Sequence, residues 1–164
     1  MKCLIVYCSS HGTTEKAVQY LKEQLLGDIL TLDLKREKLD LDLSYYDKVI
    51  VGGSIHAGRI QRRIKKFIEL HHDALIETDL GLFLCCMRDG DTAIEQFNNA
   101  FPRDLRKNSD ALGLFGGEFL FSKMNFLEKQ IVKKVVGVTT EQSNLDFEAI
   151  KDFAAKINHL KSFV

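Results

Sequence analysis

Short, nearly continuous apolar runs alternate along the chain with stretches in which apolar residues recur at helical spacing. Continuous runs are typical of strands that are covered on both faces, and they lie at residues 2–8, 48–53 and 80–87. A fourth run, 111–119, predicts the last strand of the sheet. Residues 28–34 alternate between apolar and polar positions instead, which predicts a strand at the edge of a sheet.

Helices are predicted between these strands, because apolar residues there recur every three or four positions. The first helical stretch covers residues 17–26, and Gly27 follows at a position suited to ending it. The other helical stretches cover residues 60–71, 92–101, 123–136 and 146–161. Strands that alternate with helices favour parallel pairing with right-handed crossovers. The pattern therefore predicts an α/β fold of the doubly wound, three-layer type.

Length and charge narrow the class of protein. A chain of 164 residues fits one domain, which we expect to cover residues 1–164. Lys plus Arg (23) balance Asp plus Glu (23), so no net charge attracts nucleic acid, and none is expected as a partner. The apolar runs are well short of the roughly 18 residues of a membrane span, and no signal-peptide pattern follows Met1. We therefore expect a cytoplasmic protein.

The four cysteines, at positions 3, 8, 85 and 86, form neither a C-x-x-C pair nor a His/Cys spacing typical of a metal site. Three of them lie inside apolar runs, whereas Cys8 stands where the first run ends and the first loop begins. Two adjacent cysteines would form only a strained disulfide. We interpret the cysteines as reduced and mostly structural, and we expect no metal. Tyr7, in the first apolar run, is expected to belong to the core.

The segment "CSSHGTT" at residues 8–14, between the first strand and the first helix, has the composition of an anion-binding loop. Ligands of doubly wound sheets bind at the carboxyl ends of the strands, where loops 8–14, 53–59 and 86–92 are expected. The first loop runs into a helix, so backbone N–H groups and the positive end of the helix dipole face its ligand. Hydroxyl groups add neutral donors, from Ser9, Ser10, Thr13 and Thr14. Such a loop, in which Gly12 permits close backbone approach, favours a phosphate that is held in place.

Other phosphate-binding motifs do not match this loop. A Walker loop requires a lysine after its second glycine, and the dinucleotide-binding turn requires G-x-G-x-x-G; neither is present. A cysteine phosphatase loop beginning at Cys8 would need an arginine where Thr14 stands. Phosphoryl transfer is therefore not expected. A structural alternative stays open at this point, in which Ser10 or His11 is simply the N-cap of the helix.

Taken together, the loop "YCSSHGTT", the segment "YYDKVIVGGSIHAG" at residues 45–58 and the alternation of strands and helices resemble the flavodoxin family. The first loop of that family reads roughly T/S-x-T-G-x-T and binds the phosphate of FMN. Ser9, Gly12 and Thr14 match this pattern. The resemblance implies FMN as the cofactor and a flavodoxin-like doubly wound three-layer fold, with a five-stranded parallel sheet in the order 2-1-3-4-5.

Within that family, the chain resembles the flavodoxin-like menaquinone-dependent protoporphyrinogen dehydrogenases. The resemblance rests on residues 46–71, on "ALGLFGGEF" at 111–119 with the basic, apolar stretch after it, and on "LDFEAIKDFAAKINHL" at 145–160. It implies an FMN oxidoreductase that passes reducing equivalents from an organic donor, such as a porphyrinogen, to a quinone or a redox protein.

The resemblance also implies which residues bind FMN. The phosphate would be held by Ser9, Ser10, His11, Gly12, Thr13 and Thr14. One face of the flavin ring would lie against Ser54, Ile55, His56, Ala57 and Gly58. The pyrimidine edge of the ring would meet Cys86, Met87, Arg88, Asp89 and Gly90. No catalytic side chain is expected, because the flavin carries the redox chemistry. His56 lies either beside the ring or at the surface as an ordinary histidine.

Basic residues gather directly after the second loop, where five of the eight residues 59–66 are Lys or Arg. A solvated helix face accounts for such a cluster. Beside a flavin, Arg59, Arg62 and Arg63 would also attract an anionic substrate or partner, such as a porphyrinogen with its propionates. The apolar, lysine-flanked stretch at 119–136 either packs on the sheet or makes a peripheral membrane contact, where a quinone would be met.

Two other functions stay open alongside the oxidoreductase. In the first alternative the protein is a small electron-transfer flavodoxin. In the second it is a flavin-free interaction module that has kept the fold. Electron-transfer flavodoxins are usually strongly acidic, which the equal numbers of basic and acidic residues disfavour. The hydroxyl-rich first loop disfavours the flavin-free module, because that loop is suited to binding a phosphate.

Overall fold

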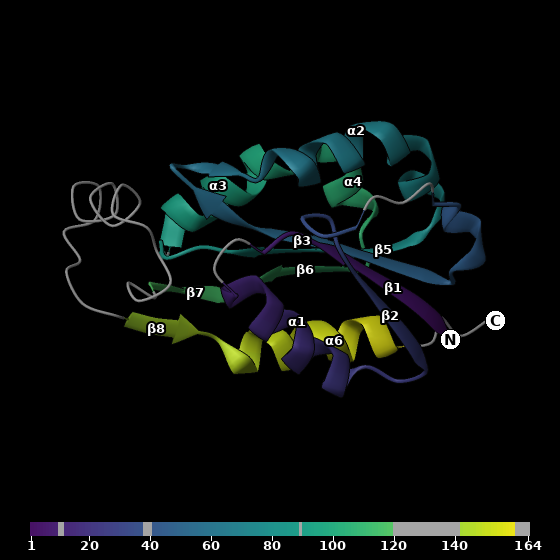
Figure 1. The fold of residues 1–164 in the computed structure, drawn as a ribbon, viewed down its shortest axis with the longest axis horizontal. Coiled ribbons are helices and arrows are strands. Elements are labelled where there is room, and N and C mark those ends of the chain that lie inside the picture. Colours follow the sequence, from purple (N-terminus) through teal and green to yellow (C-terminus); the bar gives the residue numbers. More distant parts are fainter. Residues whose placement is uncertain (10–11, 38–40, 89, 120–141, 160–164) are drawn as a thin grey trace.

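A computed structural model describes residues 1–9, 12–37, 41–88, 90–119 and 142–159. Its centre is a sheet whose parallel strands are ordered β2-β1-β3-β5-β6 (Figure 1). These strands are β1 (Lys2–Tyr7), β2 (Asp28–Asp33), β3 (Lys48–His56), β5 (Asp79–Cys85) and β6 (Ala111–Leu114). Counted along the chain, the five parallel strands have the order 2-1-3-4-5, so the predicted flavodoxin-like sheet is confirmed.

Burial along the strands follows the sequence pattern. Every residue of β1 after Lys2 is buried, and so are the first six residues of β3, because layers of helices cover both faces of these central strands. The first four residues of β2 alternate between exposed and half-buried, as expected for the edge of the sheet. Apolar periodicity therefore predicted these three strands and whether each lies in the centre or at the edge of the sheet.

Helices cover the two faces of the sheet (Figure 1). One face carries α1 (Thr13–Gln24) and α6 (Phe147–Asn158), and the other carries α2 (Arg62–Glu77), α3 (Gly90–Ala100) and α4 (Arg103–Asn108). The buried side chains accordingly form two clusters, one on each side of the sheet. Each of these helices except the short α4 was predicted, with bounds that differ by a few residues. The predicted helix at 123–136 lies outside the described residues.

Aromatic rings build the core between the sheet and α6. Phe83 stacks on Phe115 with ring centroids 4.7 Å apart, and Phe153 of α6 meets Phe115 edge-on at 5.2 Å. The ring of Phe83 fills the space beside Gly52, where a Cβ would lie 2.1 Å from the ring. Only glycine fits at this position in the middle of β3.

Polar contacts tie the two helices of the α1/α6 layer to the sheet and to each other. The buried Lys48, at the start of β3, donates through Nζ to the carbonyl of Ile157 in α6. Asn158 donates through Nδ2 to the Gln24 carbonyl at 2.9 Å and accepts from the Leu26 N–H at 2.9 Å. These bonds supply partners for groups at the C-terminal ends of α1 and α6, which helical geometry itself leaves unpaired.

Two sequence predictions were wrong in detail. Segment 111–119 is not one strand, because β7 (Gly116–Phe119) leaves the sheet and pairs antiparallel with β8 (Gln142–Leu145). The chain turns between β6 and β7 at Gly116, whose φ of 72° suits glycine. Ile60, expected on a helical stripe, belongs instead to β4 (Arg59–Ile60), which pairs antiparallel with β3. The short helix η1 (Leu43–Tyr45) was also not predicted.

Candidate functional site

Three predicted loops begin at the same edge of the sheet. β1 pairs with β3 through Tyr7 and Gly52, and β3 pairs with β5 through Ser54 and Cys85. Because parallel strands end at one edge, the segments that follow these three strands start side by side. Ser10, His11 and Asp89, which were predicted to bind the cofactor, lie outside the described residues.

Ser9 organises the start of the first helix. Its side chain is buried, and Oγ accepts hydrogen bonds from the N–H groups of Gly12 at 3.1 Å and Glu15 at 3.3 Å. A hydroxyl has two acceptor lone pairs and one donor hydrogen, so these two bonds leave only the O–H of Ser9 for a ligand. Because this hydroxyl can still donate a hydrogen bond but accept none, it suits a phosphate oxygen, which is an acceptor.

The N-cap of α1 is Gly12, with a φ of 88°, and not Ser10 or His11 as the structural alternative proposed. The Glu15 N–H is taken by Ser9, and the Lys16 N–H donates to the Gly12 carbonyl. The N–H groups of Thr13 and Thr14 lie in the first turn, where helical geometry provides no acceptor. This helix start therefore fits an anion, with two backbone donors, the helix dipole and the Ser9 hydroxyl.

The second loop is a tight β-hairpin rather than an irregular loop. Ile55 pairs with Ile60, and His56 pairs with Arg59, which leaves Ala57 and the following glycine as the two turn residues. Both have positive φ, 49° at Ala57 and 79° at Gly58, as required in the favoured two-residue hairpin turn. The residues from His56 to Gly58 are exposed, and a Cβ at Gly58 would meet no atom within 4 Å. The tip of the hairpin thus offers an open, backbone-lined surface to a flat ligand.

Sequence reasoning missed Gln61, which links the first loop to this hairpin. Its Nε2 donates to the Cys8 carbonyl at 2.9 Å and to Ser54 Oγ at 2.6 Å, and its Oε1 accepts from the Ser54 N–H at 2.8 Å. Ser54 Oγ also lies 3.1 Å from Nε2 of His56. No sequence signal pointed to Gln61, because the helix predicted over 60–71 included it; only the structure places it directly before α2, at the N-cap.

The third loop joins β5 to α3. Cys86 is buried, Met87 is half-buried and Arg88 is exposed, and the Cys86 thiol donates to the Arg88 carbonyl at 3.6 Å. Gly90 begins α3 with a φ of 56°, and a Cβ there would meet no atom within 4 Å. This loop, like the hairpin, is open around its glycine.

The thiols and the tyrosine near these loops are structural groups, as the sequence indicated. The four cysteines are free thiols, and all are buried. Burial raises the pKa of both the Cys8 and the Cys86 thiols, which keeps them neutral. Burial and the neighbouring Asp33 raise the pKa of Tyr7 to about 12. None of these groups is poised to ionise near neutral pH.

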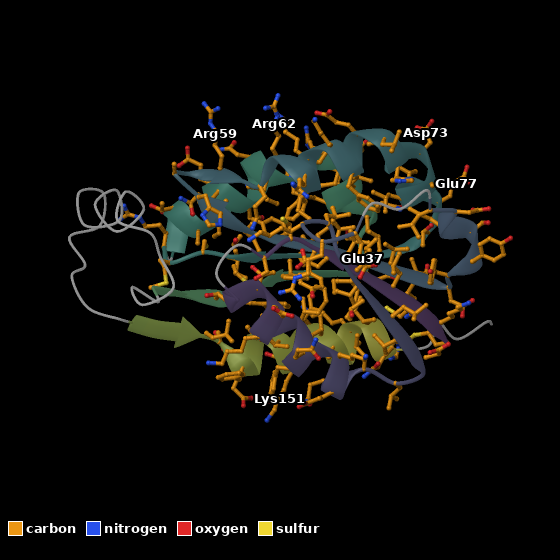
Figure 2. All side chains as sticks on the ribbon, viewed as in Figure 1. Glu37, Arg59, Arg62, Asp73, Glu77 and Lys151 are labelled. Atoms are coloured by element: carbon orange, nitrogen blue, oxygen red, sulfur yellow. The ribbon has the colours of Figure 1, made fainter. Side chains whose placement is uncertain are left out.

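The arginines of the basic cluster after the hairpin do not all have the same surroundings. Figure 2 shows the side chains of Arg59 and Arg62 projecting from the same side of the molecule, away from the ribbon. Arg63 is engaged differently, because its guanidinium donates to the carbonyls of Leu34 at 2.8 Å and Lys35 at 3.1 Å. Arg63 therefore ties the start of α2 to the segment after β2, and the outward charge beside the hairpin comes from the other two arginines.

Some site types find no support in the described ranges of the chain. No three His, Cys, Asp or Glu side chains there are grouped to hold a metal ion. Every helix in those ranges is too short or too polar to span a bilayer. A cavity of about 340 Å³ lies between α2 and the α3–α4 connection, and its lining includes Lys65, Glu69 and Arg106 but no residue of the three loops.

The family model of the Flavodoxin domain matches residues 4–146, so the chain belongs to this family. It is a flavodoxin-like flavoprotein, and FMN, the cofactor that the resemblance implied, is confirmed at the level of the family.

Relatives with similar sequences are named Protoporphyrinogen IX dehydrogenase (quinone). The relative from Leishmania major is 24% identical, over 94% of this chain and 73% of its own length. The relative from Escherichia coli K12 is 22% identical, over 98% of this chain and 96% of its own length. The similarity therefore extends along nearly the whole chain.

Solved structures with the same fold are flavodoxins. The two-electron reduced flavodoxin of Megasphaera elsdenii has a TM-score of 0.58 at 13% identity and covers 94% of this chain and 98% of its own. Oxidised Flavodoxin 1 of Bacillus cereus has a TM-score of 0.55 at 16% identity, with coverage of 98% and 100%. At such identities the likeness shows the fold alone, which agrees with the strand order above.

Proposed function

We propose that the protein is an FMN-dependent oxidoreductase that passes reducing equivalents from an organic donor to a quinone or a protein acceptor. The observation that carries this proposal is the chain-long similarity to dehydrogenases named for a quinone acceptor, on a family scaffold whose helix start and hairpin fit FMN. Protoporphyrinogen is the proposed donor, on the strength of the names of these relatives.

The proposed placement of FMN follows from the chemistry of the three loops. The phosphate is held at the start of α1 by the N–H groups of Thr13 and Thr14 and the hydroxyl of Ser9. The ring lies against the hairpin tip at Ala57–Gly58, and the third loop after Cys86 meets its pyrimidine edge. Support comes from the open space at Gly58 and Gly90, where no Cβ restricts a ligand.

When bound, FMN supplies the acceptance and release of electrons. The protein's own groups then bind FMN and orient it. Neutral donors hold the phosphate without proton transfer, and the short hairpin presents backbone rather than bulky side chains beside the ring. None of the neighbouring thiols or Tyr7 is assigned a proton-transfer role, because burial raises their pKa values.

Arg59 and Arg62 are proposed to attract the anionic donor. Both are exposed, one in β4 and the other in the first turn of α2, directly after the hairpin. Two outward cations beside an open ligand edge raise the local concentration of an anion such as a porphyrinogen with propionates. Arg63, which the sequence grouped with them, is proposed to act through the backbone contacts described above.

The experiment begins with the flavin itself. The purified protein, incubated with FMN and freed of excess, is expected to show flavin absorbance bands. Absence of these bands would remove the oxidoreductase and the electron-transfer alternative together, and would favour the interaction module.

The second experiment addresses the substrate. FMN-loaded protein is incubated without oxygen with protoporphyrinogen and a menadione-like quinone, and porphyrin fluorescence is followed against an equal concentration of free FMN. We expect faster porphyrin formation with the protein. A rate equal to that of free FMN would leave an FMN oxidoreductase with another donor, or an electron-transfer flavodoxin if the reduced protein passes electrons to redox proteins instead.

Contact with a membrane surface, where a menaquinone would be met, is part of the same proposal. The stretch that suggested it, 119–136, lies outside the described residues after Phe119. Co-sedimentation with anionic vesicles in low and high salt tests the contact, and equal recovery in the supernatant with and without vesicles would contradict it.

A further inference from the structure

Gln61 connects two segments that the proposed function assigns to opposite ends of FMN. It is the N-cap residue of α2, a position where Ser, Thr, Asp or Asn normally accepts a hydrogen bond from the helix. The Gln61 side chain makes no such bond. It reaches instead to the end of β1, through the Cys8 carbonyl, and to Ser54. A residue that departs from the local rule for its position is expected to serve the site.

The orientation of the Gln61 amide is defined by its partners. Oε1 accepts from the Ser54 N–H, whereas Nε2 donates to the Cys8 carbonyl. Turning the amide over would set donor against donor and acceptor against acceptor, so only one orientation satisfies both sides. Gly53 leaves the necessary room, because a Cβ there would lie 2.5 Å from Oε1. The space and the partners are thus matched to an amide at position 61.

A continuous chain of contacts runs through this amide. From the hairpin, His56 lies 3.1 Å from Ser54 Oγ, which accepts from Gln61 Nε2 at 2.6 Å. The same nitrogen donates to the carbonyl of Cys8. Cys8 is joined by a peptide bond to Ser9, whose hydroxyl accepts from the Glu15 N–H in the first turn of α1. The backbone at Cys8, directly before Ser9, and the backbone at Ser54 in β3 are therefore held by the same side chain.

We propose that Gln61 is a positioning residue that couples the two halves of the FMN site, so that phosphate bound in the first loop increases the affinity of the hairpin for the flavin ring. This inference rests on the proposed placement of FMN. Phosphate that fixes the first loop also fixes the Cys8 carbonyl, which holds the Gln61 amide and through it Ser54. By linkage, a ring bound at the hairpin strengthens phosphate binding by the same factor.

The test replaces FMN by two separate ligands, riboflavin and inorganic phosphate. The dissociation constant of riboflavin is measured by fluorescence quenching with saturating phosphate and with chloride at equal ionic strength. For the unmodified protein we expect phosphate to lower this constant by about five-fold or more, the lower end of typical couplings. The decisive quantity is the ratio of the dissociation constant in chloride to that in phosphate. In Gln61→Met, which keeps the length of the side chain without its amide, this ratio is expected to fall close to one. A general loss of stability does not produce this change, because the ratio is taken within one protein.

Two variants sharpen the comparison. Gln61→Glu keeps an acceptor for the Ser54 N–H but, when ionised, cannot donate to the Cys8 carbonyl, so its ratio is also expected near one. Gln19→Met makes the same exchange as Gln61→Met at an exposed position of α1, and should keep the ratio of the unmodified protein. If Gln61→Met does not fold, Gly53→Ala displaces the amide by steric contact and is expected to lower the ratio as well.

Two results would overturn the inference. The first is an equal ratio in the unmodified protein and Gln61→Met. The second is a ratio of one in the unmodified protein while FMN and riboflavin still bind, which would leave the proposed function intact. If the unmodified protein bound no FMN, the proposed function and the coupling would both be wrong.

Discussion

Ser9→Ala is expected to weaken the binding of FMN through its phosphate alone. Both acceptor lone pairs of Ser9 Oγ are occupied by the N–H groups of Gly12 and Glu15, so the hydroxyl has only its hydrogen to offer a ligand. A hydrogen bond to a charged group contributes about 1.5–3 kcal/mol. Loss of this bond should raise the dissociation constant of FMN by about ten-fold to 150-fold.

The same substitution should also lower stability, because Ser9 Oγ accepts a hydrogen bond from the Glu15 N–H in the first turn of α1. Loss of a capping side chain costs about 0.5–2 kcal/mol. For a chain of this size each kcal/mol lowers Tm by about 2–4 °C, so we expect a decrease of about 1–8 °C. Ser109→Ala is a matched control, because its hydroxyl makes one bond, to the Leu105 carbonyl at 2.7 Å, far from the three loops.

Fluorescence titrations with FMN and riboflavin separate the two effects. Ser9→Ala should weaken FMN and leave riboflavin, which has no phosphate, nearly unchanged, and Ser109→Ala should alter neither. Equal weakening of both ligands would show that Ser9 acts only through the shape of the loop. Unchanged FMN affinity would show that the phosphate lies elsewhere.

Three further predictions concern charge, capping and pH. Changing Arg59 and Arg62 to Glu should slow the reaction with an anionic donor and flatten its salt dependence, because exposed charges act over about 8 Å at physiological ionic strength; equal salt slopes would contradict steering. Lys48→Met should lower the free energy of unfolding by about 1–3 kcal/mol, since the Ile157 carbonyl loses its donor, and an unchanged urea midpoint would refute this. Burial raises the pKa of the Cys3 thiol from 9.0 to about 12, so the folded protein keeps a proton that the unfolded chain releases. The free energy of unfolding should therefore fall as pH rises from 9 to 12, less steeply in Cys3→Ala, and equal slopes would rule out this contribution.

Apolar periodicity predicted the order of the strands and helices because burial is a local and repetitive property. It failed at 111–119, where eight of the nine residues are apolar or glycine but the strand leaves the sheet after Leu114. The partner of the second half is β8, which comes more than twenty residues later in the chain. No local pattern indicates where a strand exchanges one partner for another that is distant in sequence.

The candidate site likewise has features that the sequence determined and features that only the tertiary structure decided. By itself the sequence determined the residue types of the first loop and, through the strand and helix pattern, that three loops meet at one edge of the sheet, because both depend on composition and period. Only the tertiary structure decided that Gly12 caps α1, that Arg63 is held by carbonyls after β2, and that Gln61 joins the first loop to the hairpin. The role of Gly12 depends on its positive φ. The roles of Arg63 and Gln61 depend on carbonyls that belong to distant segments of the chain, and neighbouring residues carry no information about which segment the fold brings close.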